Sequence, residues 1–79
     1  MTNKELYDQA FMTTFSIEDS MLNNELIYNG ITAWDSIGHM ALIAALEEKF
    51  DIMMETDDII DFSSYVEGMK ILGKYDVNF

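Results

Sequence analysis

Apolar side chains recur every three or four residues in two long stretches of the chain, which is the spacing of one face of an α-helix. The first stretch spans residues 3 to 15, and Thr2 or Asn3 can cap its start. Its apolar stripe consists of Leu6, Tyr7, Ala10, Phe11 and Thr14 or Phe15. Because aromatic stripes of this kind usually pack into a core, we expect this helix to be structural.

The second stretch spans residues 36 to 50 and is rich in alanine, leucine and glutamate, which are good helix formers. Its apolar stripe consists of Leu42, Ile43, Leu46 and Phe50. Asp35 and Ser36 stand at its entrance, and both residue types favour a helix N-terminus. The pattern is lost after Asp51, so a helix over 36–50 is predicted.

Residues 16 to 35 form a long connection that is rich in serine, asparagine and aspartate, the residues of turns. Asn29-Gly30 is a turn signal, and a short helical turn is expected around Glu18–Leu22. A loop of this length without structure is unusual in a small domain. Apolar residues are interleaved along it, so we expect the connection to be pinned to the core.

After a link at residues 51–55, a short helix is predicted at 56–61, with Thr56 as its cap and two acids in its first turn. Ser63 or Ser64 can cap a last helix, and Ser64 with Glu67 has the spacing of a capping box. Gly73 ends this helix, and residues 76–79 are expected to be a frayed tail. The predicted fold is one all-α domain over 1–79, a small bundle of three main helices and one short helix.

Charge narrows the possible partners. Fifteen acids against four bases give a net charge of −11, which repels nucleic acid and anionic membranes and favours a basic protein surface. Self-repulsion predicts a monomer and a marginally stable fold. The alternative is that the acidity only keeps a small domain soluble.

Cysteine is absent, so disulfides and thiolate chemistry are excluded. No segment approaches the roughly 20 apolar residues of a membrane span. The first residues lack the basic and then apolar pattern of a signal peptide. A cytoplasmic location is therefore expected.

The sequence gives little support for a catalytic pair or for a metal site. His39 follows Ser36 by three residues, so a Ser–His nucleophilic pair is conceivable on one helix face. Nothing in the sequence indicates an oxyanion hole, and we expect His39 to be a partly exposed surface residue and the protein not to be an enzyme. The acids at Asp51, Glu55, Asp57, Asp58 and Asp61 lack the spacing of a calcium loop and are expected to be a solvated face, so no metal site is predicted.

The residues alone allow two interpretations of Ser36. It can be a plain helix cap, which is the usual role of serine at such a position. It can also be a covalent attachment point, because a phosphate at the first turn of a helix meets free backbone N–H groups and the positive end of the dipole. Physical chemistry by itself does not choose between the two.

Asp35-Ser36-Ile37, followed at the right distance by Ala45-Leu46-Glu47-Glu48-Lys49-Phe50, resembles the acyl carrier protein family. The resemblance extends over nearly the whole chain and includes its length, acidity and order of helices. It implies that Ser36 carries a 4′-phosphopantetheine arm, installed from coenzyme A by a phosphopantetheinyl transferase with magnesium. Acyl groups would then be held on the arm as thioesters.

The resemblance also implies roles for other residues. Asp35 would be the motif aspartate that the transferase reads. Glu47 and Glu48 would face basic docking patches on partner enzymes, with Ile37 and Met40 as the apolar part of that contact. A space for an acyl chain is expected among core residues of the second and last helices, namely Leu42, Leu46 and Phe50.

Gly38, His39 and Ala41 occupy places where the family often has acids, and Trp34 precedes the aspartate. These residues are more similar to free-standing carriers of specialised pathways than to the central fatty-acid carrier, and peptidyl carriers match less well. We therefore expect an acyl carrier of fatty acid, polyketide or sugar-modifying pathways. The alternative is an unmodified acidic helical adaptor or inhibitor that binds a basic protein surface.

Overall fold

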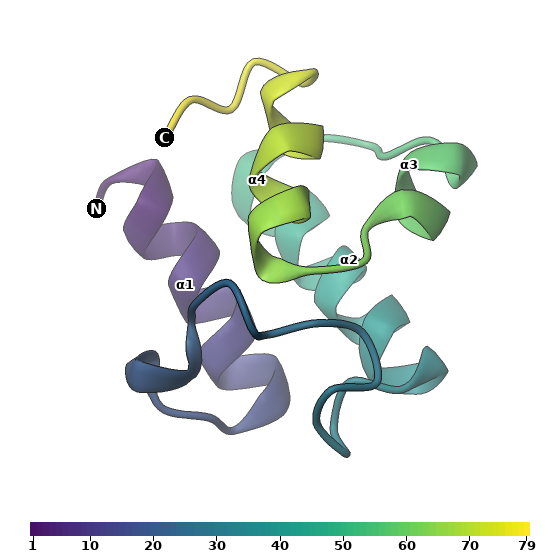
Figure 1. Ribbon diagram of the computed structural model, residues 1–79. Helices are drawn as coiled ribbons and strands as arrows, with labels where there is room; N and C mark the ends of the chain where they lie inside the picture. The colour runs from purple at the N-terminus through teal and green to yellow at the C-terminus, as the bar shows by residue number, and fades with distance from the viewer.

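The computed structural model describes residues 1–79 and confirms the predicted all-α fold, with a single turn of 3₁₀ helix in the long connection (Figure 1). The elements in chain order are α1 (Asn3–Phe15), η1 (Asp19–Met21), α2 (Ser36–Phe50), α3 (Thr56–Asp61) and α4 (Tyr65–Gly73). None of the helices has the length and apolar character that crossing a membrane would require.

Local capping explains where most helices begin. Thr2, rather than Asn3, caps α1: its hydroxyl accepts from the Glu5 backbone N–H at 3.1 Å, and the Glu5 carboxylate accepts from the Thr2 backbone N–H at 3.1 Å. Ser64 caps α4 by accepting from the Glu67 N–H at 2.9 Å. The return bond that would complete this second capping box is absent. Both starts were predicted because capping depends only on residues three apart.

The cap predicted for α3 is wrong. Thr56 is the first residue of the helix, and Glu55 stands at the N-cap without a side-chain hydrogen bond to the helix. A helix of six residues with no side-chain cap gains little from local interactions. The position of α3 therefore depends on its contacts with neighbouring elements.

The long connection is pinned to the core, as predicted. Leu26 and Trp34 are buried, and the chain around Ile27 pairs with the segment that leads into α4. In this pairing the Tyr28 N–H donates to the Ser63 carbonyl at 2.9 Å, and the Tyr65 N–H donates to the Leu26 carbonyl at 2.9 Å. The connection passes close to the start of α4 in Figure 1.

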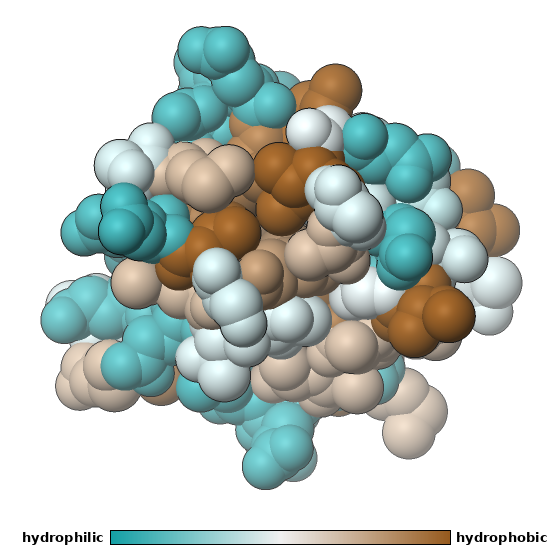
Figure 2. All heavy atoms as spheres, turned by 90° about the horizontal axis from the view of Figure 1, so that it is seen from below, coloured by the Kyte–Doolittle hydropathy of each residue, from teal (hydrophilic) through white to brown (hydrophobic).

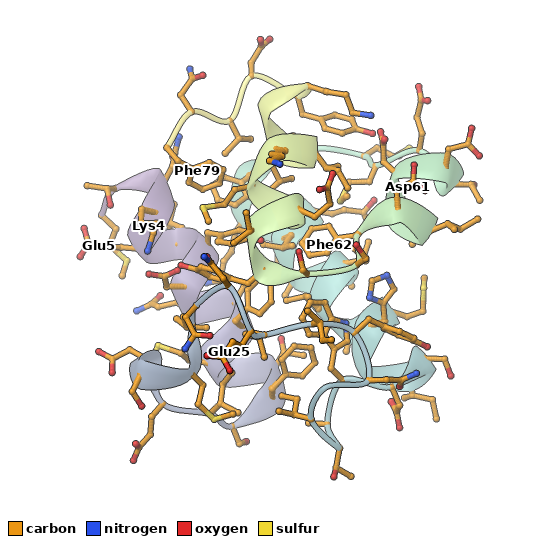
Figure 3. The ribbon with its side chains drawn as sticks, in the orientation of Figure 1. Lys4, Glu5, Glu25, Asp61, Phe62 and Phe79 are labelled. Atoms are coloured by element: carbon orange, nitrogen blue, oxygen red, sulfur yellow. The ribbon has the colours of Figure 1, made fainter.

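Aromatic rings form the centre of the molecule. Tyr7, Phe11, Trp34 and Phe62 are all less than 2% exposed. Phe62, at the junction between α3 and α4, points into this centre (Figure 3), and its ring centroid lies 6.3 Å from that of Phe11. The periodicity predicted Tyr7 and Phe11 as core residues, but Trp34 and Phe62 lie outside the helices and were not assigned to the core.

The C-terminal tail is not frayed. Val77 is 5% exposed, and the Phe79 ring lies back against α1, 5.2 Å from the Tyr7 ring (Figure 3). The Asn3 side-chain amide donates to the Asn78 carbonyl at 3.0 Å, so the two ends of the chain meet (Figure 1). The tail lacks helical periodicity, which is why the sequence pattern did not predict this docking.

One acid of the expected solvated face is buried. Asp51, Glu55, Asp57 and Asp61 are exposed, but Asp58 is only 7% exposed. Its carboxylate pairs with the Lys74 ammonium and accepts from the Tyr75 hydroxyl at 2.5 Å.

The Asp58 network ties α3 to the end of α4. The Tyr75 hydroxyl also accepts from the Glu55 backbone N–H at 2.9 Å, so it reaches both ends of the first turn of α3. Hydrogen bonds from Lys74 first, and then from Tyr75, hold the pKa of the Asp58 carboxyl below its usual value. The network therefore stabilises the fold only while Asp58 is ionised.

This linkage predicts a pH dependence. Because folding lowers the pKa of Asp58, its contribution is complete above the unfolded-state value of about 4 and is lost as pH falls through the folded-state value. Asp58→Asn is expected to be less stable than wild type at pH 7, and the difference is expected to shrink towards pH 3. Urea unfolding of both proteins across this range measures it, and a difference that is independent of pH would contradict the assignment.

Candidate functional site

Asp35, not Ser36, caps α2. The Asp35 carboxylate accepts from the Gly38 backbone N–H at 2.8 Å, and Ser36 is the first residue of the helix. The Ser36 side chain is exposed and makes no hydrogen bond with the rest of the protein. The reading of Ser36 as a plain helix cap is therefore wrong, because its neighbour already fills that role. The Ser36 hydroxyl lies at the positive end of the α2 dipole and has no structural role.

Gly38 allows the preceding loop to press against the first turn of α2. A Cβ atom at this position would lie 1.9 Å from the Ala33 carbonyl oxygen and 3.2 Å from the Phe15 ring. The loop could not take its present path beside any larger residue. This close approach brings Trp34 into the core and places Asp35 at the cap.

Trp34 anchors the loop next to Ser36 from the inside. Its ring is fully buried, 5.5 Å from the Phe11 ring and 5.4 Å from the Phe15 ring by their centroids. Its indole N–H donates to His39 Nδ1 at 2.9 Å. The residue before the Asp-Ser pair thus fixes the start of α2 to the core, a role that local sequence patterns do not indicate.

His39 is partly exposed, as expected, and it is held by hydrogen bonds at both of its nitrogens, which the sequence did not indicate. Nδ1 accepts from Trp34, and Nε2 donates to the Ile59 carbonyl at 2.8 Å. Since an indole nitrogen can only donate and a carbonyl can only accept, the imidazole is the tautomer with its proton on Nε2. No lone pair is left to take a proton from Ser36, and no hydrogen bond joins the two residues. The Ser–His pair is therefore not assembled as a nucleophile and base.

A hollow of about 390 Å³ opens beside Ser36, between the first turns of α2 and the segment that contains α3. Its lining residues are Tyr28, Ser36, His39, Met40, Ile59, Ile60, Phe62 and Ser63. The space expected along Leu42, Leu46 and Phe50 is not present: Leu42 and Leu46 are completely buried in the packed core. Leu42 and Leu46 belong to the same buried cluster as the aromatic residues, and neither hollow in the protein is lined by them or by Phe50.

Apolar side chains are exposed around Ser36. Ile37 is 81% exposed and Met40 is 55% exposed, so both side chains are accessible from outside. Ile60 on α3 is 71% exposed and was not singled out from the sequence, although it lines the same hollow. Figure 2 shows the side of the molecule with the long connection, where apolar residues lie in the middle and also at one edge, between hydrophilic residues.

The two glutamates assigned to partner recognition differ in their environment. Glu48 is exposed, about 18 Å along the helix axis from Ser36 at 1.5 Å per residue. Glu47 is half-buried, and its carboxylate accepts from the Met54 backbone N–H at 2.9 Å. Glu47 therefore holds the link after α2 in place, whereas Glu48 is available to a partner.

No three His, Asp or Glu side chains are arranged to hold a metal ion. The chain matches no protein-family model, no curated protein and no solved structure. The case for function therefore depends on the residues around Ser36.

Proposed function

We propose that this protein is an acyl carrier that holds acyl groups as thioesters on a 4′-phosphopantetheine arm attached to Ser36. The observation that supports this proposal is that the helix cap and the free hydroxyl at the start of α2 belong to two different residues. Asp35 makes the cap, so the neighbouring Ser36 hydroxyl is exposed and unbonded. In the transfer, Ser36 Oγ loses its proton and bonds to the phosphorus that bears the pantetheine of coenzyme A, and adenosine 3′,5′-bisphosphate leaves.

The surface around Ser36 suits brief contacts with several enzymes in turn. The net charge of −11 favours encounter with basic patches, and Glu48 is an exposed acid on α2. Ile37 and Met40 add an apolar contact next to the attachment residue. Tethering the acyl group raises its local concentration at each docked enzyme. We propose a monomeric carrier of a specialised cytoplasmic pathway, served by a phosphopantetheinyl transferase and by acyl-loading and acyl-transferring enzymes.

Intact mass tests the proposal. Incubation with a broad-specificity phosphopantetheinyl transferase, coenzyme A and magnesium is expected to add one phosphopantetheinyl group to the wild-type protein and none to Ser36→Ala. Ser36→Ala is expected to keep the wild-type melting temperature, because the Ser36 side chain makes no hydrogen bond and the cap is at Asp35.

Ser63→Ala is the matched control, since Ser63 is also an exposed serine that lines the hollow. Ser63→Ala is expected to be modified as fully as wild type. No mass gain on folded wild-type protein, or an equal gain on Ser36→Ala, would contradict the proposal.

The second candidate is an unmodified acidic adaptor. The adaptor is also favoured by exposed apolar residues, such as Ile37 and Ile60, on a strongly acidic protein. An adaptor has no use for the Ser36 hydroxyl. Binding to a basic partner that is unaffected by Ser36→Ala, together with no modification of the wild type, would favour this candidate over the carrier.

A further inference from the structure

The short helix α3 makes few hydrogen bonds of its own. Because it is only six residues long, most of its carbonyl groups have no partner inside the helix. No side chain caps its start, and no backbone N–H donates to the Ile59 carbonyl. The one hydrogen bond that this carbonyl accepts comes from His39 Nε2, at 2.8 Å. His39, on α2, therefore satisfies the C-terminal end of α3.

The two halves of α3 are held by different elements. In the first half, the Asp58 carboxylate pairs with Lys74, and the Tyr75 hydroxyl bonds to Asp58 and to the Glu55 backbone. All of these partners come from the end of α4. In the second half, the bond from His39 to Ile59 is the hydrogen bond that links α3 to another element. The placement of the second half of α3 against α2 therefore depends on His39.

His39 also ties α3 to the loop before Ser36. Its Nδ1 accepts from the Trp34 indole N–H at 2.9 Å, and the Trp34 ring is completely buried in the core. Because one rigid imidazole makes both bonds, the loop before Ser36 and the second half of α3 are fixed to the same residue of α2. A change at His39 is therefore felt on both sides of Ser36.

Exposed apolar side chains follow directly after both bonded residues. Met40 follows His39 on α2 and is 55% exposed, and Ile60 follows Ile59 on α3 and is 71% exposed. Both line the hollow that Ser36 also lines. Met40 and Ser36 are placed by the same helix, whereas the position of Ile60 relative to them depends on how α3 is held. The bond from His39 to the residue before Ile60 sets that position.

From this arrangement we infer that His39 is a positioning residue for the modification of Ser36: it holds Ile60 beside Met40, so that α2 and α3 present one apolar docking surface to the phosphopantetheinyl transferase. The inference rests on the proposed carrier function. The surface belongs to a protein with a net charge of −11, so the partner that fits it has an apolar contact surrounded by basic residues. His39 acts through Ile60 and takes no part in the transfer itself.

Two substitutions distinguish the two bonds of His39. In His39→Asn the shorter side chain keeps an acceptor for the Trp34 indole but does not reach the Ile59 carbonyl, whereas in His39→Gln the longer side chain brings a donor to it. Transfer is measured with a broad-specificity phosphopantetheinyl transferase, coenzyme A and magnesium, at a temperature where each protein is folded. We expect His39→Asn to raise the KM for the carrier about tenfold with kcat nearly unchanged, because docking is lost and the chemistry is not. His39→Gln is expected to keep a KM close to that of wild type.

Ile60→Ala tests whether His39 acts through Ile60. The Ile60 side chain is exposed, so this variant is expected to fold as wild type does and to raise KM about tenfold. Adding His39→Asn is expected to raise KM little further, since both changes remove the same contact. Met53→Ala is the matched control, because Met53 is 86% exposed but does not line the hollow, and it is expected to keep the wild-type KM. An unchanged KM in His39→Asn, an equal rise in His39→Gln, or rises that multiply in the double variant would overturn the inference.

A measurement on the wild-type protein tests the bond to Ile59 even if a His39 variant does not fold. His39 is the only histidine, so the ¹⁵N chemical shifts of its ring are unambiguous. We expect them to show the proton on Nε2 at neutral pH, and a proton on Nδ1 alone would overturn the inference. Transfer to wild type with the same KM in every variant overturns only the role of His39. No transfer to folded wild type overturns the carrier function and the role of His39 together.

Discussion

Replacing Gly68 with alanine is expected to lower the free energy of unfolding by about 3 kcal/mol or more, the upper part of the range for overpacking a core. Gly68 is buried on the inner face of α4. A Cβ atom there would lie 2.2 Å from Phe62 Cζ and 2.3 Å from the Tyr7 hydroxyl oxygen. Neither ring can move away freely, because both are packed in the aromatic centre and the Tyr7 hydroxyl donates to the Tyr65 carbonyl at 2.6 Å.

This loss is close to the whole free energy of unfolding expected of the protein. A domain of this size has a net stability of roughly 3–5 kcal/mol, so the variant is expected to be largely unfolded at room temperature. The helix propensity of alanine offsets at most about 1 kcal/mol of the loss. Circular dichroism during urea and thermal unfolding measures the change.

Gly73→Ala is the matched control in the same helix. A Cβ atom at Gly73 would meet no atom within 4 Å. This variant is expected to be as stable as wild type or up to about 1 kcal/mol more stable. If Gly68→Ala unfolds at the same urea concentration as Gly73→Ala, the close packing of α4 against Phe62 and Tyr7 is refuted.

Replacing Gly38 with alanine is expected to lower the free energy of unfolding by about 2–3 kcal/mol and to slow the proposed modification of Ser36. Helix propensity alone predicts the opposite sign, because alanine is the better helix former. The clash at 1.9 Å is with the backbone oxygen of Ala33, which cannot turn away as a side chain can. The loop has to shift, and the shift displaces both the buried Trp34 and the Asp35 cap.

Two measurements separate these effects. Urea unfolding gives the loss of stability, and the initial rate of phosphopantetheine transfer, measured at a temperature where the variant is folded, reports the presentation of Ser36. Asp35→Ala tests the cap alone and is expected to cost about 1 kcal/mol. A Gly38→Ala protein that is more stable than wild type would show that the loop does not press on α2 in solution.

These predictions concern residues whose roles were not visible in the local pattern. Gly38 stands out in the sequence only as a glycine where acyl carrier proteins often have an acid, whereas in the structure it is the point where the loop and α2 meet. Trp34 reads as a departure from a family pattern, whereas it is a buried anchor bonded to His39. Gly38 contacts the loop before α2, and Trp34 contacts residues of both α1 and α2. Neither contact follows from the spacing of residues within one helix.

By itself the sequence determined the all-α class, the bounds of α1 and α2 and the start of α4. These features depend on residues within about four positions of one another, through periodicity and capping. The role proposed for Ser36 came from a different source, the resemblance of its motif to a known family. Tertiary structure alone decided that Asp58 is buried against Lys74, 16 residues away, and that Tyr7 bonds to Tyr65, 58 residues away. It also decided that His39 bonds to both Trp34 and Ile59 beside the hollow and that the tail packs on α1. Such contacts are selected by the shape and unpaired hydrogen-bonding groups of surfaces that exist only once the helices have packed, so no local pattern encodes them.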